Sequence, residues 1–165
     1  MPSNPFHILR DTLIGDDLPA WRRTKKRKPL TTAKFYFFDI GIVRHLQRRR
    51  HLQEGSPEFG EAFEAYLHHE LKTYCDYEGV VELAYWRSTS NFEVDFILND
   101  RTAIEVKAKR HVSDRDLRGL RALQEERLLQ HYIVVSQEAT PRRVDGIDIL
   151  PWRDFLDRLW DGAYS

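Results

Sequence analysis

Apolar and polar residues alternate along two neighbouring stretches of the chain, residues 92–98 and 102–109. In the first stretch the even positions are apolar, and the odd positions include the acids Glu93 and Asp95. The second stretch repeats the pattern, with apolar residues or threonine at even positions and mostly charged residues at odd ones. A period of two is typical of half-buried strands. The pattern therefore predicts two consecutive β-strands.

The residues between these strands, 99–101, decide which side chains face each other. If all three form the loop, the two apolar sides meet and Asp95 lies opposite Glu105. A two-residue loop would instead set Asp95 against Ile104 and mix the two faces. We therefore predict a three-residue hairpin loop, with the cross-strand pairs Leu98–Thr102, Phe96–Ile104 and Val94–Val106.

Helical spacing of apolar residues predicts much of the remaining framework. The longest helix is expected from Pro57 to about Tyr77. Another is expected to begin after Ser113 as the N-cap, with Asp114 and Asp116 in its first turn, and to end near Leu128. Shorter helices are predicted over residues 6–14, directly after 41 and around 152–159, and strands over 34–39, 80–86, 131–136 and, as a short edge strand, 147–150.

The order of the main elements is helix, three strands, helix and strand. An antiparallel meander followed by a helical crossover to a further strand gives a mixed sheet. We therefore predict an α/β (α+β) fold with a mixed four- to five-stranded sheet and helices on both faces, in the order αβββαβ. Residues 48–57 contain few apolar side chains and are predicted to form a flexible connection.

Length and cysteine content narrow the class of protein. The chain has 165 residues and one cysteine, Cys75. This length suits one domain with one core, and a single cysteine excludes a disulfide framework and a cysteine-based zinc site. No apolar run reaches the roughly 20 residues that cross a bilayer, and the amino terminus lacks the apolar core of a signal peptide. We expect a soluble, cytoplasmic protein without a membrane partner.

The charges are unevenly distributed although the formal net charge is zero. Residues 1–50 hold 12 Lys and Arg against 4 Asp and Glu, whereas the remainder holds 14 against 22. A basic amino-terminal arm, residues 1–33, therefore precedes a more acidic domain, residues 34–165. Such an arm binds nucleic acid, clasps its own domain, or forms a solvated linker. Its densest part can bind phosphates without reading sequence and consists of Arg22, Arg23, Lys25, Lys26, Arg27 and Lys28.

Asp95 and Glu105 are the first candidates for a chemical site. Carboxylates opposed across a hairpin repel each other, and a hard divalent cation such as Mg²⁺ removes the conflict by binding both. Lys107 lies on the same face as Glu105 and could hold a water or a phosphate oxygen. The alternative is that both acids are solvated surface charges and that Lys107 forms a cross-strand ion pair with Glu93.

Two acids of the long predicted helix are candidates for a third ligand. Glu70 falls near the middle of the apolar stripe and Glu64 at its edge. A carboxylate on an apolar face is unfavourable unless it is paired or binds a metal. The alternative is that one of them bonds a backbone group or an arginine such as Arg87.

Several blocks of the sequence resemble a known family. Glu64, Asp95 and Glu105-Val106-Lys107 resemble the PD-(D/E)XK, or restriction-endonuclease-like, nucleases. Six blocks in order resemble the carboxy-terminal domain of uncharacterised prokaryotic AAA-type ATPases, from about Leu13 onward. The blocks are residues 35–41, Phe63-Glu64 with Glu70-Leu71, Glu93-Val94-Asp95-Phe96, Glu105-Val106-Lys107, Leu117-Arg118-Gly119-Leu120 and Ile133-Val134-Val135-Ser136.

The resemblance implies metal-dependent hydrolysis of DNA phosphodiester bonds. Glu64, Asp95 and Glu105 would hold Mg²⁺ or Mn²⁺, Lys107 would orient the attacking water, and Glu70 is the second choice for the helix acid. The ATPase part and its Gly-Lys-Ser/Thr phosphate loop are missing, because no glycine here is followed by lysine. The chain is therefore expected to have no nucleotide site and no ATPase activity of its own.

The same resemblance leaves a second function open. The domain could be catalytically inactive and bind DNA, or dock on an AAA-type ATPase partner as a regulatory module. DNA is the expected partner for the first function and for one form of the second. The sequence does not decide between a monomer and a homodimer.

Overall fold

The computed structural model describes residues 14–46, 48, 52–79 and 82–164. The predicted helix over residues 6–14 lies, apart from Ile14, outside the described residues. The strands are β1 (Gly15–Leu18), β2 (Lys34–Phe37), β3 (Leu83–Arg87), β4 (Glu93–Leu98), β5 (Thr102–Lys107), β6 (His131–Ser136), β7 (Arg142–Val144) and β8 (Ile147–Pro151). The helices are α2 (Ile40–Leu46), α3 (Pro57–Glu78), α4 (Arg118–Gln124) and α5 (Trp152–Trp160), with a 3-10 turn over Asp114–Leu117.

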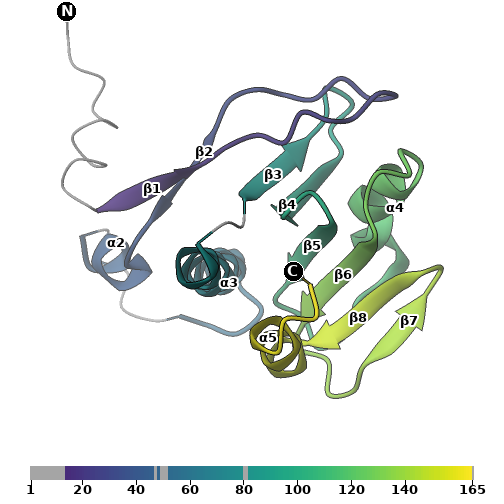
Figure 1. Ribbon diagram of the computed structural model, residues 1–165. Coiled ribbons are helices and arrows are strands. Elements are labelled where there is room, and N and C mark those ends of the chain that lie inside the picture. Colours follow the sequence, from purple (N-terminus) through teal and green to yellow (C-terminus); the bar gives the residue numbers. More distant parts are fainter. Residues whose placement is uncertain (1–13, 47, 49–51, 80–81, 165) are drawn as a thin grey trace, which may run out of the picture.

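A six-stranded mixed sheet with the order β3-β4-β5-β6-β8-β7 forms the centre of the described chain (Figure 1). Strands β3, β4 and β5 are antiparallel, and β6 runs parallel to β5 after the crossover through α4. The predicted class, mixed α/β, is confirmed, but the predicted count of four to five strands is wrong. The stretch predicted as an edge strand, β8, pairs with β6 on one side and with β7 on the other.

The additional strand, β7, escaped prediction because it has three residues, two of them arginine. It is joined to β8 by the two-residue turn Asp145-Gly146, in which φ is 50° and 80°. Positive φ at both positions is the requirement of the tight hairpin turn that Asp-Gly favours. The Asp-Gly pair is thus the signal from which this strand could have been found.

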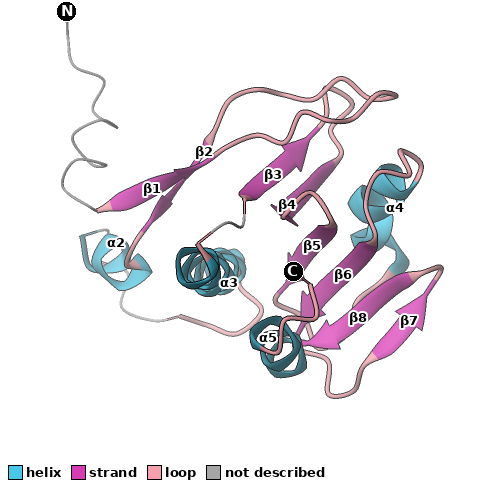
Figure 2. Cartoon of the chain, in the orientation of Figure 1, coloured by secondary structure: helices cyan, strands magenta, loops and turns pink. Residues whose placement is uncertain are grey.

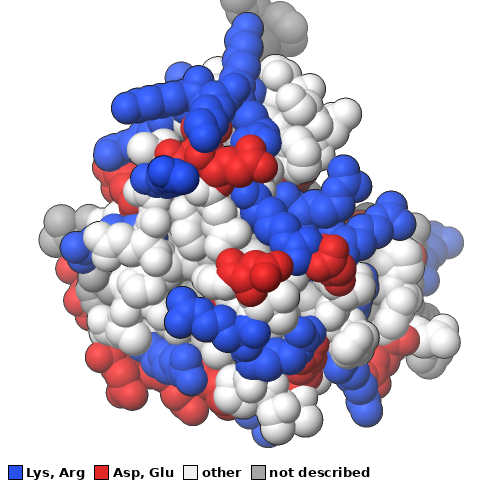
Figure 3. Space-filling model, turned by 90° about the vertical axis from the view of Figure 1, so that its right-hand side faces the viewer, with Lys and Arg blue, Asp and Glu red and all other residues white. Residues whose placement is uncertain are grey.

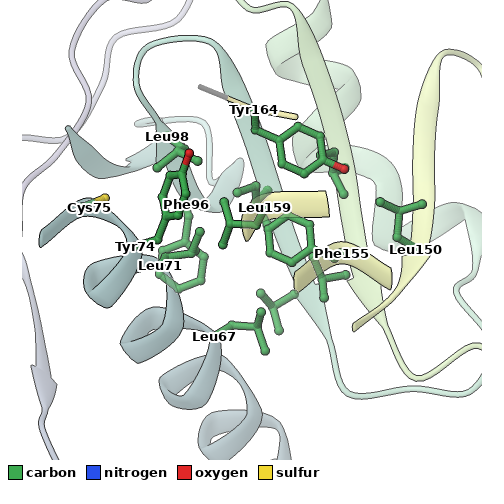
Figure 4. Packing of buried hydrophobic residues seen from close by; sticks show 14 of the residues in the cluster. Leu67, Leu71, Tyr74, Cys75, Phe96, Leu98, Leu150, Phe155, Leu159 and Tyr164 are labelled. Atoms are coloured by element: carbon green, nitrogen blue, oxygen red, sulfur yellow. The ribbon is translucent and has the colours of Figure 1, made fainter. Parts of the chain in front are cut away.

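Helices cover both faces of the sheet (Figures 1 and 2). Helices α3 and α5 lie on one face and α4 on the other. The α3 side encloses a cluster of apolar residues that includes Leu67, Leu71, Phe96, Phe155 and Leu159 (Figure 4). The α4 side encloses a second cluster, to which Val94 and Ile97 contribute from β4. Each face of the sheet thus packs against the apolar side of a helix, α3 on one face and α4 on the other.

The long helix α3 agrees with its prediction and has clear end signals. The hydroxyl of Ser56 accepts a hydrogen bond from the N–H of Phe59 at 3.1 Å, and Pro57 occupies the first turn. Gly79, with φ of 73°, ends the helix. The helix after Ser113 is shorter than predicted: it begins as the 3-10 turn and ends at Gln124. Arg127, with φ of 55°, prevents it from continuing to Leu128.

The amino-terminal stretch is packed against the sheet beside β3. Leu18 and Trp21 are buried in the two apolar clusters. The N–H of Trp21 donates to the carbonyl of Tyr85 at 2.7 Å, and that of Leu30 donates to Arg87 at 2.7 Å. The domain therefore includes residues before the boundary that the sequence suggested at residue 34. None of the described helices is long and apolar enough to cross a membrane.

Candidate active site

A β-bulge in β4 determines where Asp95 points. Opposite Ala84 and Trp86 of β3 lie Ile97 and Val94 of β4, so that β4 uses three steps where β3 uses two. The extra residue falls at Asp95-Phe96 and reverses the alternation beyond it. Val94 consequently packs on the α4 side, whereas Phe96 packs on the α3 side. The prediction that both would share one face is wrong, because a period of two cannot reveal an inserted residue.

The hairpin loop has the predicted length. The observed cross-strand pairs are Leu98–Thr102, Ile97–Ala103 and Phe96–Ile104, which leaves residues 99–101 as the loop. Asn99 and Asp100 have positive φ, of 51° and 54°. The predicted pair Val94–Val106 is absent from the ladder, since the bulge turns β4 away before this point.

The side chain of Asp95 takes over the hydrogen bond that the ladder no longer makes. Its Oδ2 accepts the N–H of Val106 at 2.9 Å. Both Asp95 and Glu105 are buried, with exposed fractions of 7% and 8%. Glu105 Oε1 lies 2.5 Å from the Nζ of Lys107, while its buried Oε2 has no hydrogen-bond partner among the described residues. A buried carboxylate oxygen without a partner is unfavourable and marks a place where a cation or a water fits.

Of the two helix acids, Glu64 is the one that approaches the hairpin. Its Oε1 accepts a hydrogen bond from the hydroxyl of Tyr36 at 2.5 Å and lies 3.5 Å from the Nζ of Lys34. Glu70 instead accepts a hydrogen bond from the hydroxyl of Tyr66, one turn earlier on α3. Arg87, the alternative partner that the sequence suggested for these acids, pairs with Glu93 instead, at 3.5 Å.

Lys34 and Tyr36 were missed as site residues. They alternate along β2, so both side chains point from one side of this strand toward α3 and β4. The Nζ of Lys34 lies 2.6 Å from Glu93 Oε1 and 3.8 Å from Asp95 Oδ1. The alternative prediction paired Lys107 with Glu93. In the structure Glu93 pairs with Lys34 instead, and Lys107 pairs with Glu105. The signal was the lysine and the tyrosine at alternate positions of a predicted strand.

Burial and mutual repulsion affect the ionisation of these acids. Burial raises the pKa of Asp95, and Glu64 adds to the rise. Burial also raises the pKa of Glu105, and Asp95 adds to it. Although burial alone would lower the pKa of Lys107, the nearby carboxylates of Glu105 and Asp95 raise it. The cluster thus combines acids that resist ionisation with lysines that stay charged, which is typical of functional sites.

The acids do not form a metal cage in their present positions. Among the residues that the structure describes, no group of three His, Cys, Asp or Glu side chains is arranged to hold a metal ion. Lys34 separates Glu64 from Asp95, and Lys107 neutralises Glu105. The predicted ligands Glu64, Asp95 and Glu105 thus lie close together, and the ammonium groups of Lys34 and Lys107 balance part of their negative charge.

The basic arm is clasped to the domain by Glu126. The carboxylate of Glu126 accepts the backbone N–H groups of Lys25, Lys26 and Arg27 at 2.9, 2.9 and 3.1 Å. Arg23 pairs with Asp100 at 2.6 Å, and Arg27 pairs with Glu125 at 2.6 Å. The intramolecular clasp, one of the alternatives that the charges allowed, is thus present in the structure.

Most cations of the arm still face outward. Arg22, Arg23, Lys25, Lys26 and Lys28 are exposed. The connection between β1 and β2 projects from the upper right of Figure 1, and on that side Lys and Arg side chains gather around a few acids near the top (Figure 3). The clasp orders the backbone; Arg23 pairs with Asp100 and the Nζ of Lys26 donates to the carbonyl of Glu125, but these side chains remain exposed to solvent.

We expect Glu126→Ala to detach the arm. Three backbone N–H groups would lose a carboxylate that is only 1% exposed, and the free energy of unfolding should fall by about 2–3 kcal/mol. Urea unfolding measures this loss, and limited trypsin digestion should cut the variant faster within residues 22–28. Glu125→Ala is the matched control, because Glu125 is 59% exposed and its loss should change stability by about 0.5 kcal/mol or less. Equal trypsin rates for both variants would contradict the clasp.

His68, on α3, makes the stability of the folded domain depend on pH. Its ring is buried and stacks on Tyr36, with ring centroids 4.1 Å apart. Burial lowers its pKa from 6.5 to about 4; His69 and Lys72 act in the same direction, and Asp16 opposes them. The folded state therefore binds this proton less tightly than the unfolded state, so stability falls as the pH drops from about 6.5 to about 4.

His68→Gln should remove this dependence. The stability advantage of the wild type over the variant should shrink by about 2–4 kcal/mol between pH 7 and pH 4. Urea unfolding of both proteins at several pH values measures the difference, in which the titration of all other groups cancels. A difference that does not change with pH would show that His68 has the same pKa in the folded and the unfolded state.

Comparison with known proteins identifies the family. The profile of DUF4143, a domain of unknown function, matches residues 59–155, more than half of the chain. The chain belongs to the DUF4143 family. DUF4143 domains are found carboxy-terminal to AAA-type ATPases in prokaryotes. No match was found among curated proteins, and none among solved structures.

The match to DUF4143 covers most of the candidate site but not all of it. The matched residues include Glu64, Asp95, Glu105 and Lys107, whereas Lys34 precedes them. The part of the site contributed by α3, β4 and β5 therefore belongs to the DUF4143 match, and β2 adds Lys34 and Tyr36 from outside it.

Proposed function

We propose that this DUF4143 domain has the restriction-endonuclease-like, PD-(D/E)XK fold and hydrolyses phosphodiester bonds of DNA with Mg²⁺. The observation that carries the proposal is the grouping of Glu64 from α3, Asp95 from the bulge of β4 and Glu105 with Lys107 from the end of β5. These elements follow each other as α3, β3, β4, β5, α4 and β6, the order αβββαβ that the apolar patterns predicted.

The residues present suit a hard divalent cation. All candidate ligand atoms of Glu64, Asp95 and Glu105 are carboxylate oxygens, which Mg²⁺ and Mn²⁺ prefer. The Oε2 of Glu105, which has no hydrogen-bond partner among the described residues, offers a ligand atom in the buried part of the site. A bound cation would neutralise charge that develops on the phosphate and would lower the pKa of a bound water.

Lys107 is suited to act on the reacting groups. It is held 2.5 Å from Glu105 Oε1, and its charge is maintained by Glu105 and Asp95. An ammonium group at this point can donate a hydrogen bond to an attacking water or to a phosphate oxygen. This role requires a positive charge at a fixed position, and Lys107 has such a position as the last residue of β5.

The exposed cations of the basic arm would contact the DNA backbone. Such contacts are independent of base sequence and weaken steeply as salt concentration rises. The clasp by Glu126 would place these cations on a fixed surface of the domain. We therefore expect binding that does not depend on sequence, with any structural preference determined by the active site.

Cleavage assays with purified protein test the proposal. Plasmid, branched and single-stranded DNA are incubated with Mg²⁺, with Mn²⁺ and with EDTA. We expect cleavage of at least one substrate with a metal and none with EDTA. Failure to cleave any of these substrates would refute the nuclease function. Cleavage by Glu105→Ala and Lys107→Ala at the wild-type rate would refute it as well.

The second candidate is an inactive module that binds DNA or docks on an AAA-type ATPase. The favouring observation is that Lys34 and Lys107 already neutralise much of the acidic cluster. This function predicts metal-independent DNA binding that falls with salt and with replacement of the exposed arm cations. Retention of DNA binding after Arg22, Arg23, Lys25, Lys26 and Lys28 are replaced by Gln would exclude the arm as the binding surface.

A further inference from the structure

The ammonium group of Lys34 lies among carboxylates from three different elements. Its Nζ is 2.6 Å from Glu93 Oε1, 3.5 Å from Glu64 Oε1 and 3.8 Å from Asp95 Oδ1. Glu64 and Asp95 are two of the three acids proposed to hold a divalent cation. Lys34 thus occupies the space between two of the proposed ligands.

We propose that Lys34 is a built-in counter-cation that a divalent metal ion must displace in order to bind. The inference rests on the proposed metal site and extends it by naming a competitor within the same chain. The ammonium and the metal cannot both lie between the same two carboxylates. Lys34 therefore lowers the affinity of the site for metal and stabilises the domain while the metal is absent.

The balance of charge supports competition rather than permanent pairing. Four carboxylates, Glu64, Glu93, Asp95 and Glu105, face the ammonium groups of Lys34 and Lys107. Arg87 also pairs with Glu93, at 3.5 Å, so one negative charge remains when all of these groups are ionised, and a divalent cation that replaces Lys34 beside Glu64 and Asp95 would compensate this charge.

The geometry also explains why Lys34 rather than Lys107 would move. Within the described part of the chain, the one proposed ligand that forms an ion pair with Lys107 is Glu105, on the same strand. Lys34 comes from β2, which belongs to a separate two-stranded sheet, and its shortest contact is with Glu93. Because Glu93 is outside the proposed ligand set, Lys34 keeps a partner after it leaves Glu64 and Asp95.

Titration with Mn²⁺, followed by electron paramagnetic resonance, tests the competition directly. The variant Lys34→Met removes the charge and keeps a chain of similar length. We expect it to bind Mn²⁺ about tenfold more tightly than the wild type, with the gain abolished in Lys34→Met/Glu105→Gln. Lys72→Met is the matched control, since Lys72 pairs with Asp76 on an exposed part of α3 and should leave the affinity unchanged. Equal or weaker binding by Lys34→Met would overturn the inference.

A measurement on the wild type remains informative if Lys34→Met does not fold. Acetylation of lysines by an N-hydroxysuccinimide ester is followed by mass spectrometry with and without Mg²⁺. Displacement predicts that Lys34, whose side chain is 25% exposed, reacts at least threefold faster with Mg²⁺, while Lys72 keeps its rate. An unchanged rate for Lys34 under saturating Mg²⁺ would show that it stays in place.

The outcomes separate this inference from the nuclease proposal. Tighter Mn²⁺ binding by Lys34→Met without DNA cleavage would support the competition and refute the nuclease. Cleavage by the wild type together with equal Mn²⁺ affinities would support the nuclease and overturn the competition. If neither protein binds Mn²⁺, both proposals are wrong.

Discussion

Gly119→Ala should destabilise the domain by about 3 kcal/mol or more. A Cβ on Gly119 would lie 2.0 Å from the backbone carbonyl oxygen of Glu93 and 3.3 Å from a methyl group of Val94. Neither α4 nor β4 can yield without a shift of backbone, because the carbonyl belongs to a strand in the middle of the sheet. The shift would begin two residues before Asp95 and so reach the candidate active site.

Gly60→Ala is the matched control for this prediction. Gly60 lies in α3, and a Cβ there would meet nothing within 4 Å. Alanine favours helix over glycine, so this variant should gain up to about 1 kcal/mol. Urea unfolding followed by circular dichroism measures both variants. Equal stability of the two would show that α4 does not approach β4 as closely as described.

Glu105→Gln should lower the rate of DNA cleavage by about 10²–10³-fold. The amide keeps the size of the side chain and its place on β5 but removes the negative charge that a divalent cation needs. Stability should change little, because the change removes a buried charge whose Oε2 has no hydrogen-bond partner among the described residues but also weakens the ion pair of Oε1 with Lys107. Initial cleavage rates and thermal unfolding of the same preparations measure the two effects.

Lysine substitutions complete this test. Lys107→Ala should slow cleavage by about 10²-fold, because it removes the cation next to Glu105. Lys109→Ala is its control: Lys109 lies two residues further along the same segment, is 52% exposed and pairs with Asp116 at 2.6 Å. A Lys109→Ala variant as impaired as Lys107→Ala would point to general loss of positive charge and would contradict a specific role for Lys107.

The local patterns predicted those elements whose signal lies within their own residues. The apolar stripe and the terminal signals predicted α3, and the alternation predicted β4 and β5 with the correct loop length. Prediction failed where the pattern was too short, as in β7, or where it was overridden by a tertiary contact. The helix after Ser113 ends early, and the following Glu126 binds the backbone of the basic arm.

The candidate site was predictable in part for the same reason. Asp95, Glu105 and Lys107 stand out because they interrupt or flank apolar strand patterns. The helical pattern alone could not decide between Glu64 and Glu70, since both lie close to the apolar stripe of one helix, and only the family resemblance favoured Glu64. Tyr36 and Lys34 contact Glu64, whereas Tyr66 contacts Glu70, and these partners are known only once the elements are packed.

The sequence by itself therefore determined the order of the main elements from α3 to β6, the hairpin loop over residues 99–101 and the family to which the chain belongs. These depend on local spacing and on residue identity. Only the tertiary structure decided the bulge at Asp95, the clasp of the basic arm and the place of Lys34 among three acids. Each of these depends on groups far apart in the chain, whose distances are fixed by packing against the sheet.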